Sequence, residues 1–163
     1  MTEQALNSVK TLHELQVKRD RREYIDLFES FLAERPDAAF GDTPRAPLNH
    51  LFADGIYIRQ IFLPAGTVAS GGIHRKCHPS FLLTGRVSVY TVDDGGLIID
   101  APKVFIAPAG CKRLVYAHRD TIWCTVHTNP DELRDPDELR KMCVVDSYDD
   151  LDISDKRKLL WLS

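Results

Sequence analysis

The sequence predicts a mainly β protein, an antiparallel sandwich or barrel with an N-terminal helical arm and short C-terminal helices. Six short runs rich in β-branched and aromatic residues lie between about residues 51 and 128, and these residue types favour strands. No helix-length pattern separates the runs, which excludes the alternation of strands and helices that builds a parallel sheet. The first 35 residues contain neither glycine nor proline and are rich in helix formers, which predicts the arm.

We expect the helical arm and its linker to occupy residues 1–47, with one or two helices over about 2–35. Apolar side chains at the spacing of one helix face mark the second half: Tyr24, Ile25, Phe28, Phe31 and Leu32. Asp20, with Glu23 three residues later, has the layout of a helix N-cap. Three prolines and a glycine between 36 and 47 then predict an irregular, exposed connection.

The β domain is expected over residues 48–128. Its predicted strands are 55–63, 81–92 with an internal glycine, 96–100, 103–107, 112–118 and 121–128. The segment VDDGGL at 92–97 has the aspartate and glycine residues of a tight hairpin turn.

Residues 129–163 are predicted to form short helices. Asn129, Pro130 and Glu132 have the pattern of a cap, a first-turn proline and an acid at the third helical position. PDELR occurs at 130–134 and again at 136–140, which we interpret as two helical turns broken at Pro136. The apolar end, Leu159–Leu162, is expected to pack on the body or on a partner subunit, because exposing it would be costly.

Composition limits the classes of partner. The formal net charge of −3, from 21 basic and 24 acidic side chains, provides no field to attract nucleic acid or an anionic membrane. No signal segment or membrane-length apolar run is visible, and the four cysteines are too widely spaced for a zinc ribbon. We therefore expect a cytoplasmic protein with reduced thiols, and a homo-oligomer assembled through the apolar terminal segments.

Two histidines four residues apart lie in a segment of regular spacing. Gly66 is followed after five residues by Gly72, then by His74, His78 and, after six residues, Gly85. This segment resembles the first motif of the cupin superfamily: glycine, five residues, His-x-His, three or four residues, glutamate, six residues, glycine. Gly72 stands where the family has its first histidine, and His78 stands where it has glutamate.

The segment 102–117 resembles the second cupin motif, with Pro108 and Gly110 in place. Arg113 replaces the histidine of that motif, and Ala117 replaces its asparagine. The resemblance covers about residues 50–128 and implies a cupin-type jelly-roll barrel. The broader sequence also looks like a group of small cupin-like proteins encoded by tailed bacteriophages and prophages, which implies virion proteins as partners and the host cytoplasm or the virion as location.

His74 and His78 are the first candidates for metal ligands. Residues an even number apart on a strand point to the same face, so both imidazoles can face the interior if the chain between them is extended. A third ligand is expected from His127, or alternatively from His118, both near the ends of predicted strands. Imidazole ligands suit a single divalent transition metal such as Fe, Zn, Mn or Ni.

Arg113 favours a different use of the same interior. A cation at a ligand position repels a metal ion, while its planar guanidinium matches a carboxylate or phosphate. The histidines would then be hydrogen-bond partners, and without any ligand they could bond to Tyr116 or Tyr57. Two functions follow: a protein that binds a transition metal or a small anion through His74 and His78, or a phage structural or accessory protein that uses the barrel as a scaffold.

Overall fold

The computed structural model describes residues 3–38 and 41–151. Helix α1 spans Glu3–Ala33. The strands are β1 Leu48–Ala53, β2 Ile56–Leu63, β3 Val68–Ser70, β4 Ile73–His74, β5 His78–Thr84, β6 Arg86–Thr91, β7 Gly95–Asp100, β8 Lys103–Ala107, β9 Arg113–Ala117, β10 Thr121–Thr128 and β11 Val144–Val145. Helix α2 spans Pro136–Cys143, and a single 3₁₀ turn spans Tyr148–Asp150.

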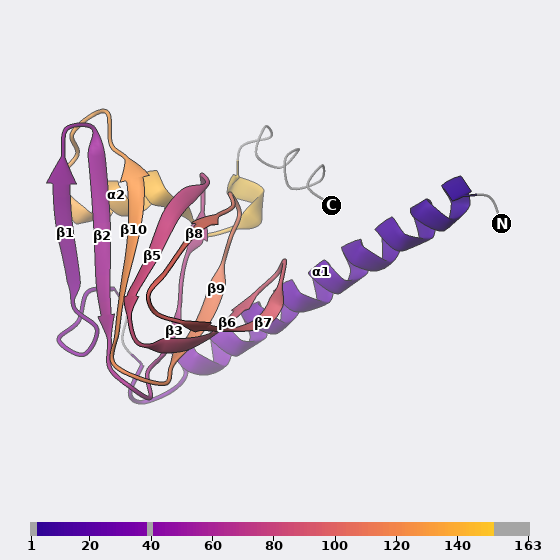
Figure 1. Cartoon of the computed structure of the whole chain (residues 1–163), viewed down its shortest axis with the longest axis horizontal. Coiled ribbons are helices and arrows are strands. Elements are labelled where there is room, and N and C mark those ends of the chain that lie inside the picture. Colours follow the sequence, from indigo (N-terminus) through magenta and orange to yellow (C-terminus); the bar gives the residue numbers. More distant parts are fainter. Residues whose placement is uncertain (1–2, 39–40, 152–163) are drawn as a thin grey trace.

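Two antiparallel sheets form the body (Figure 1). The larger has the order β1-β2-β10-β5-β8, and the smaller has the order β3-β9-β6-β7. Strands pair in nested fashion, β2 with β10, β3 with β9, β5 with β8 and β6 with β7, which is the connectivity of a jelly roll. The predicted mainly β jelly-roll class is thus confirmed, but the sheets form an open sandwich and do not close into the expected barrel.

The sheets pack together through an apolar cluster at one end of the sandwich. Leu82 and Trp123 of the larger sheet meet Val87 and Val89 of the smaller, and all four side chains are buried. Gly85 joins β5 to β6 with a φ of 94°, in the left-handed region, where the chain passes from one sheet to the other. The predicted hairpin at 92–97 joins β6 and β7, with Thr91 opposite Gly95.

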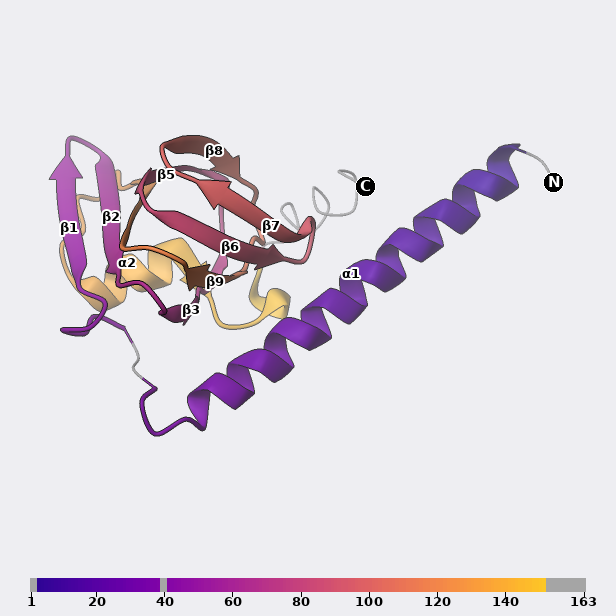
Figure 2. The same cartoon turned by 60° about the horizontal axis from the view of Figure 1, so that its bottom comes forward.

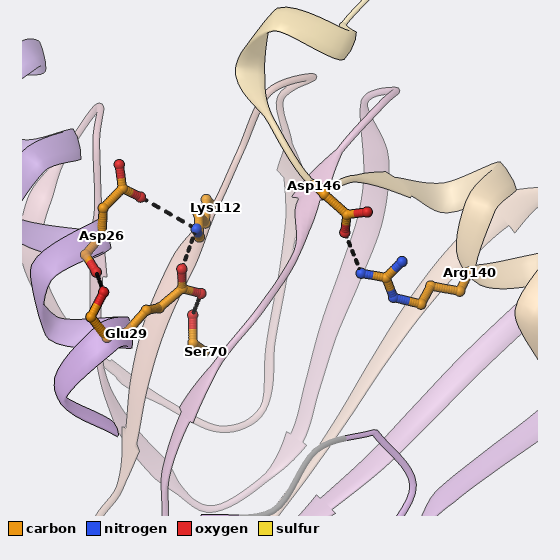
Figure 3. A network of polar contacts seen from close by, with 7 residues as sticks. Asp26, Glu29, Ser70, Lys112, Arg140 and Asp146 are labelled. Atoms are coloured by element: carbon orange, nitrogen blue, oxygen red, sulfur yellow. Dashed lines mark hydrogen bonds and ion pairs between the residues drawn. The ribbon is translucent and has the colours of Figure 1, made fainter. Parts of the chain in front are cut away.

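Helix α1 covers the outer face of the smaller sheet with its second half only. Ile25 packs with Val92 and Leu114. Lys112 pairs with Asp26 at 3.5 Å and with Glu29 at 2.5 Å, and Ser70 donates a hydrogen bond to Glu29 (Figure 3). The first half of the helix extends well beyond the sheets (Figure 2).

Residue Asp20 lies inside α1 rather than at the start of a second helix. The helix runs unbroken from Glu3 to Ala33, and the Asp20 carboxylate accepts a hydrogen bond from Gln16. The predicted cap at Asp20 is therefore wrong, because the residues before it are themselves good helix formers and leave no free backbone amides for it to cap. No helix among the described residues is long and apolar enough to span a bilayer.

Only the second PDELR segment becomes a helix. Asp135 accepts hydrogen bonds from the backbone amides of Asp137 and Glu138, and Pro136 begins α2 rather than breaking it. Asn129 is buried and closes a turn by bonding to both backbone groups of Leu133, so the predicted helix start at Asn129 is wrong. The apolar end at 159–162 lies outside the described residues.

Candidate metal centre

The inner face of the larger sheet presents polar side chains in two adjacent rows. On β2, Tyr57, Arg59 and Ile61 point to the same face, because side chains two apart share a face. Tyr57 is 1% exposed, and Ile61 packs on the apolar cluster, which identifies this face as the inner one. The same alternation on β10 places Thr125 and His127 inward with Trp123.

Strand register carries these rows across the sheet. His127 lies opposite Tyr57, and Thr125 lies opposite Arg59. On its other side, Thr125 lies opposite Ser80, two residues along β5 from His78. The inner face therefore changes from apolar at Trp123, through hydroxyls at Thr125 and Ser80, to imidazoles at His127 and His78.

His74 reaches the same place from a separate strand. A bend at residues 75–76 separates β4 from β5, so the chain between His74 and His78 is not a single extended strand. The His74 amide donates to the carbonyl of Cys111 at 3.1 Å, and its carbonyl accepts from Gly110 at 2.7 Å. These bonds fix the His74 backbone beside the β8–β9 connection.

The structure brings His74, His78 and His127 together. One ring nitrogen of each lies within 4.8 Å of those of the other two. The ring centroids of His74 and His78 are 4.0 Å apart, and those of His78 and His127 are 4.8 Å apart. The three imidazoles thus converge on a space that a single ion could share.

Hydrogen bonds leave lone pairs of this cluster unused. Nδ1 of His78 lies 3.1 Å from the carbonyl of Lys76, which can only accept, so Nδ1 carries the proton and Nε2 has the free lone pair. Nε2 of His78 and Nδ1 of His74 are both buried without a hydrogen-bond partner. Nε2 of His127 bonds to the Thr125 hydroxyl at 3.0 Å. This is the arrangement in which an outer partner holds a ring while its other nitrogen faces a metal.

All three imidazoles are neutral at neutral pH. Burial, with the neighbouring imidazoles and arginines, lowers the pKa of His74 to about 2. Burial likewise lowers the pKa of His78 and of His127 to about 4, with Arg113 acting on the first and His78 and Arg59 acting on the second. Metal ligation requires the neutral form, so no proton needs to leave before an ion binds.

The alternative third ligand, His118, lies elsewhere. Its Nε2 is 2.7 Å from the hydroxyl of Ser88, and its ring packs edge-on against Tyr116. Tyr116 is 41% exposed and alternates with the inward-facing Val115, so it lies on the outer face of the smaller sheet. The predicted contact of the interior histidines with Tyr116 is therefore wrong, while His127 on β10 joins the cluster.

Tyr57 does lie beside the cluster, as a packing residue. Its ring stacks on His127 with 6.0 Å between centroids, and its hydroxyl pairs with Nδ1 of His50 at 2.8 Å. Leu139 and Cys143 of α2 pack against it on this same face of the sheet. Burial raises the pKa of Tyr57 to about 12, so the phenol stays neutral and orients the His127 ring.

Two arginines flank the imidazoles, and sequence reasoning identified only one. Arg113 points inward from β9, with its Cζ 5.6 Å from the ring centroids of Phe105 and Trp123. Arg59 lies on β2 in the row of Thr125 and was missed. The signal for it was an arginine in phase with Tyr57 and Ile61 along an otherwise inward-facing apolar row.

Position 72, where the cupin motif has its first histidine, is crowded by a neighbouring side chain. A Cβ on Gly72 would lie 3.0 Å from Cβ of Val144 and 3.1 Å from both its Cγ atoms. Val144 is held there because β11 pairs with β4, opposite His74. The C-terminal strand thus occupies the place of the missing ligand, and His127 supplies the third imidazole from another strand.

Cysteine 77, next to His78, is exposed, as strand alternation predicts for the neighbour of an inward-facing residue. The four cysteines, all described, are free thiols. Neither Cys77 nor the buried thiols belong to the group of residues able to share an ion.

No protein-family model and no curated sequence matches the chain. Solved structures do resemble it, cupins among them. An acetylacetone dioxygenase from Acinetobacter johnsonii is 17% identical, with a TM-score of 0.43 over 58% of this chain and 71% of that one. The DMSP lyase DddQ from Ruegeria pomeroyi DSS-3 is 14% identical, with a TM-score of 0.47 over 55% and 50%. An RmlC-like cupin from Shewanella frigidimarina NCIMB 400 is 16% identical, with a TM-score of 0.45 over 58% and 91%.

Proposed function

We propose that this jelly-roll protein binds one divalent transition-metal ion through His74, His78 and His127. The observation that carries the proposal is the pair of buried, unpartnered nitrogens, Nε2 of His78 and Nδ1 of His74, within reach of the His127 ring. Leaving such atoms without a partner costs roughly 1–3 kcal/mol each, and a bound ion removes that cost.

The donor set narrows the choice of ion. Three neutral imidazoles are softer than carboxylates and suit Fe, Zn, Mn or Ni better than Mg or Ca. They leave coordination positions open, as in catalytic rather than structural sites. A metal bound there would act as a Lewis acid on a ligand in those positions.

The protein's own contribution is to hold the rings in place. The Lys76 carbonyl sets the tautomer of His78, and the Thr125 hydroxyl and the Tyr57 ring orient His127. The β4–β11 pair fixes His74. Since loss of such outer partners commonly costs 10–100-fold in metal affinity, Thr125 is a positioning residue for the centre.

Metal analysis of protein purified without a histidine tag tests the proposal. We expect about one ion per chain in the wild type after incubation with Zn²⁺ or Fe²⁺ and removal of free metal. The His74→Ala/His78→Ala double variant and His127→Ala should each lose it. His118→Ala is the matched control, because His118 lies outside the cluster, and it should bind as the wild type does.

Equal, substoichiometric metal in the wild type and in the cluster variants would refute the metal centre. The alternative scaffold role would then remain a prediction from the sequence alone.

A further inference from the structure

The two interior arginines have no carboxylate partner among the described residues. The ion pairs of residues 3–38 and 41–151 involve neither Arg59 nor Arg113. Burial is the first cause that lowers the pKa of each guanidinium. Both side chains are half-buried, and withdrawing a guanidinium from water without a paired counter-charge is costly, so two of them facing one region require an explanation.

Both guanidiniums lie near the histidine cluster. Arg59 lies opposite Thr125, two residues from His127 on β10, and Arg113 packs on Trp123 of the same strand. The arginines come from opposite sheets, Arg59 from β2 of the larger and Arg113 from β9 of the smaller. With neutral imidazoles, this part of the interior carries a net positive charge.

A hydroxyl without a partner lies between them. Ser80 is fully buried, and its Oγ makes no hydrogen bond. In the sheet, Ser80 stands opposite Thr125, which is itself opposite Arg59. On its other side it stands opposite Phe105, against which Arg113 packs. Ser80 therefore offers an unused hydroxyl donor on the sheet face between Arg59 and the Phe105 ring that Arg113 contacts.

Stacking on aromatic rings explains the orientation of the Arg113 side chain but does not neutralise its positive charge. The rings of Phe105 and Trp123 hold the guanidinium by cation–π contact, which preorganises it. Such a contact does not neutralise the charge, and no ring contact holds Arg59 in this way among the described residues. A bound anion would satisfy both arginines and Ser80 together.

We propose that Arg59, Arg113 and the Ser80 hydroxyl bind a small oxyanion, a carboxylate or a phosphate, beside the histidine cluster. A role for this oxyanion as substrate or as a further metal ligand rests on the proposed metal centre, whereas its binding to the two arginines and Ser80 does not. Arginine offers a planar fork that suits either oxyanion, and charge-assisted hydrogen bonds are the strong ones.

Calorimetric titration with malonate tests this proposal, with phosphate as a second probe and uncharged malonamide as the blank. The protein is titrated both loaded with Zn²⁺ and stripped with a chelator. We expect malonate or phosphate to bind both forms and malonamide to bind neither. Arg59→Met and Arg113→Met should each weaken anion binding at least tenfold, while Arg45→Met, at an exposed position, should not.

Measuring zinc affinity separates this inference from the metal proposal, because the arginine charges oppose binding of the metal cation and favour binding of the anion. Removing either interior arginine removes a repelling cation, so Zn²⁺ should bind as tightly or more tightly while malonate binds less. Arginine-dependent anion binding in a protein that takes up no zinc when zinc is supplied would support this inference and refute the metal centre. Zinc binding with no anion binding would support the metal centre and refute this inference.

Ser80→Ala keeps the test decisive if an arginine variant does not fold. This change removes one unpartnered hydroxyl from a buried position and should leave the melting temperature unchanged or higher. We expect it to weaken malonate binding severalfold and to leave zinc affinity unchanged. Malonate affinity equal in the wild type, Ser80→Ala and every folded arginine variant would overturn the proposal.

Discussion

The contact between Gly72 and Val144 predicts the outcome of a single added methyl group. In Gly72→Ala the new Cβ meets three atoms of Val144 at 3.0 to 3.1 Å, closer than ordinary van der Waals contact. The adjacent Gly71→Ala is the matched control, because its Cβ would meet only the carbonyl of Arg113, at 3.9 Å. Neither glycine has a positive φ, so both substitutions are compatible with the backbone.

The two substitutions therefore differ by the cost of the close contact alone. Replacing glycine where the backbone permits it stabilises a protein by roughly 0.4–1 kcal/mol through the unfolded chain, and this gain applies to both. Overpacking costs about 1–3 kcal/mol and applies only to Gly72→Ala. For a protein of this length, each kcal/mol shifts the melting temperature by about 2–4 °C. We expect Gly72→Ala to melt about 2–12 °C below Gly71→Ala.

Thermal unfolding followed by circular dichroism measures this difference, with urea unfolding as a check on the free energy. Adding Val144→Ala removes two of the three contacting atoms, so the double variant should recover part of the loss relative to the sum of the single variants. Equal melting temperatures for the two alanine variants would refute the argument that β11 crowds a side chain at position 72. The same contact predicts that Gly72→His, which restores the motif, destabilises the fold.

Three further substitutions test how the body is held together. Ile25→Ala should cost about 2–5 kcal/mol by urea unfolding, because Ile25 is buried between α1 and the smaller sheet, whereas the exposed Leu27→Ala should cost nothing measurable. If both behave alike, α1 does not depend on this packing. Tyr148→Phe should leave stability equal or higher at pH 7, because the buried hydroxyl has no partner. Burial raises the pKa of Tyr148 to about 12, so the unfolded chain ionises first and wild-type stability falls as pH rises from 10 to 12. That fall should be shallower in Tyr148→Phe, and an unchanged slope would contradict the burial of this phenol. Asp135→Ala should lower stability by about 0.5–2 kcal/mol through loss of the α2 cap, and no change in the melting curve would show that the cap is dispensable.

Local patterns predicted the parts of this protein that depend on neighbours in sequence. The helix, the later strands and the hairpin follow from composition and turn residues. His74 and His78 were identified as a pair because their spacing from Gly66 and Gly85 is a property of one short segment. The path between them was left open by the pattern, and a bend at residues 75–76 separates the two strands that carry them.

The features that the sequence pattern did not predict depend on contacts between segments far apart in the sequence. His127 and His118 are both near strand ends, and only register across β2, β10 and β5 decides which faces inward. The crowding at Gly72 depends on Val144, which is far away in the sequence. At 129–134 and 135–140 nearly the same residues differ in structure, because Glu132 bonds to the Gly55 amide and holds the first copy in a turn.

The projecting half of α1 has a consequence for how the protein behaves in solution. A helix of 31 residues is about 46 Å long, at 1.5 Å per residue, and roughly half of it lies beyond the sheets (Figure 2). A spherical chain of this length would have a radius of gyration of about 15 Å, and the extension must raise that value. A single chain will therefore migrate in gel filtration like a heavier globular protein. The predicted homo-oligomer must be tested by light scattering, which reports mass without regard to shape.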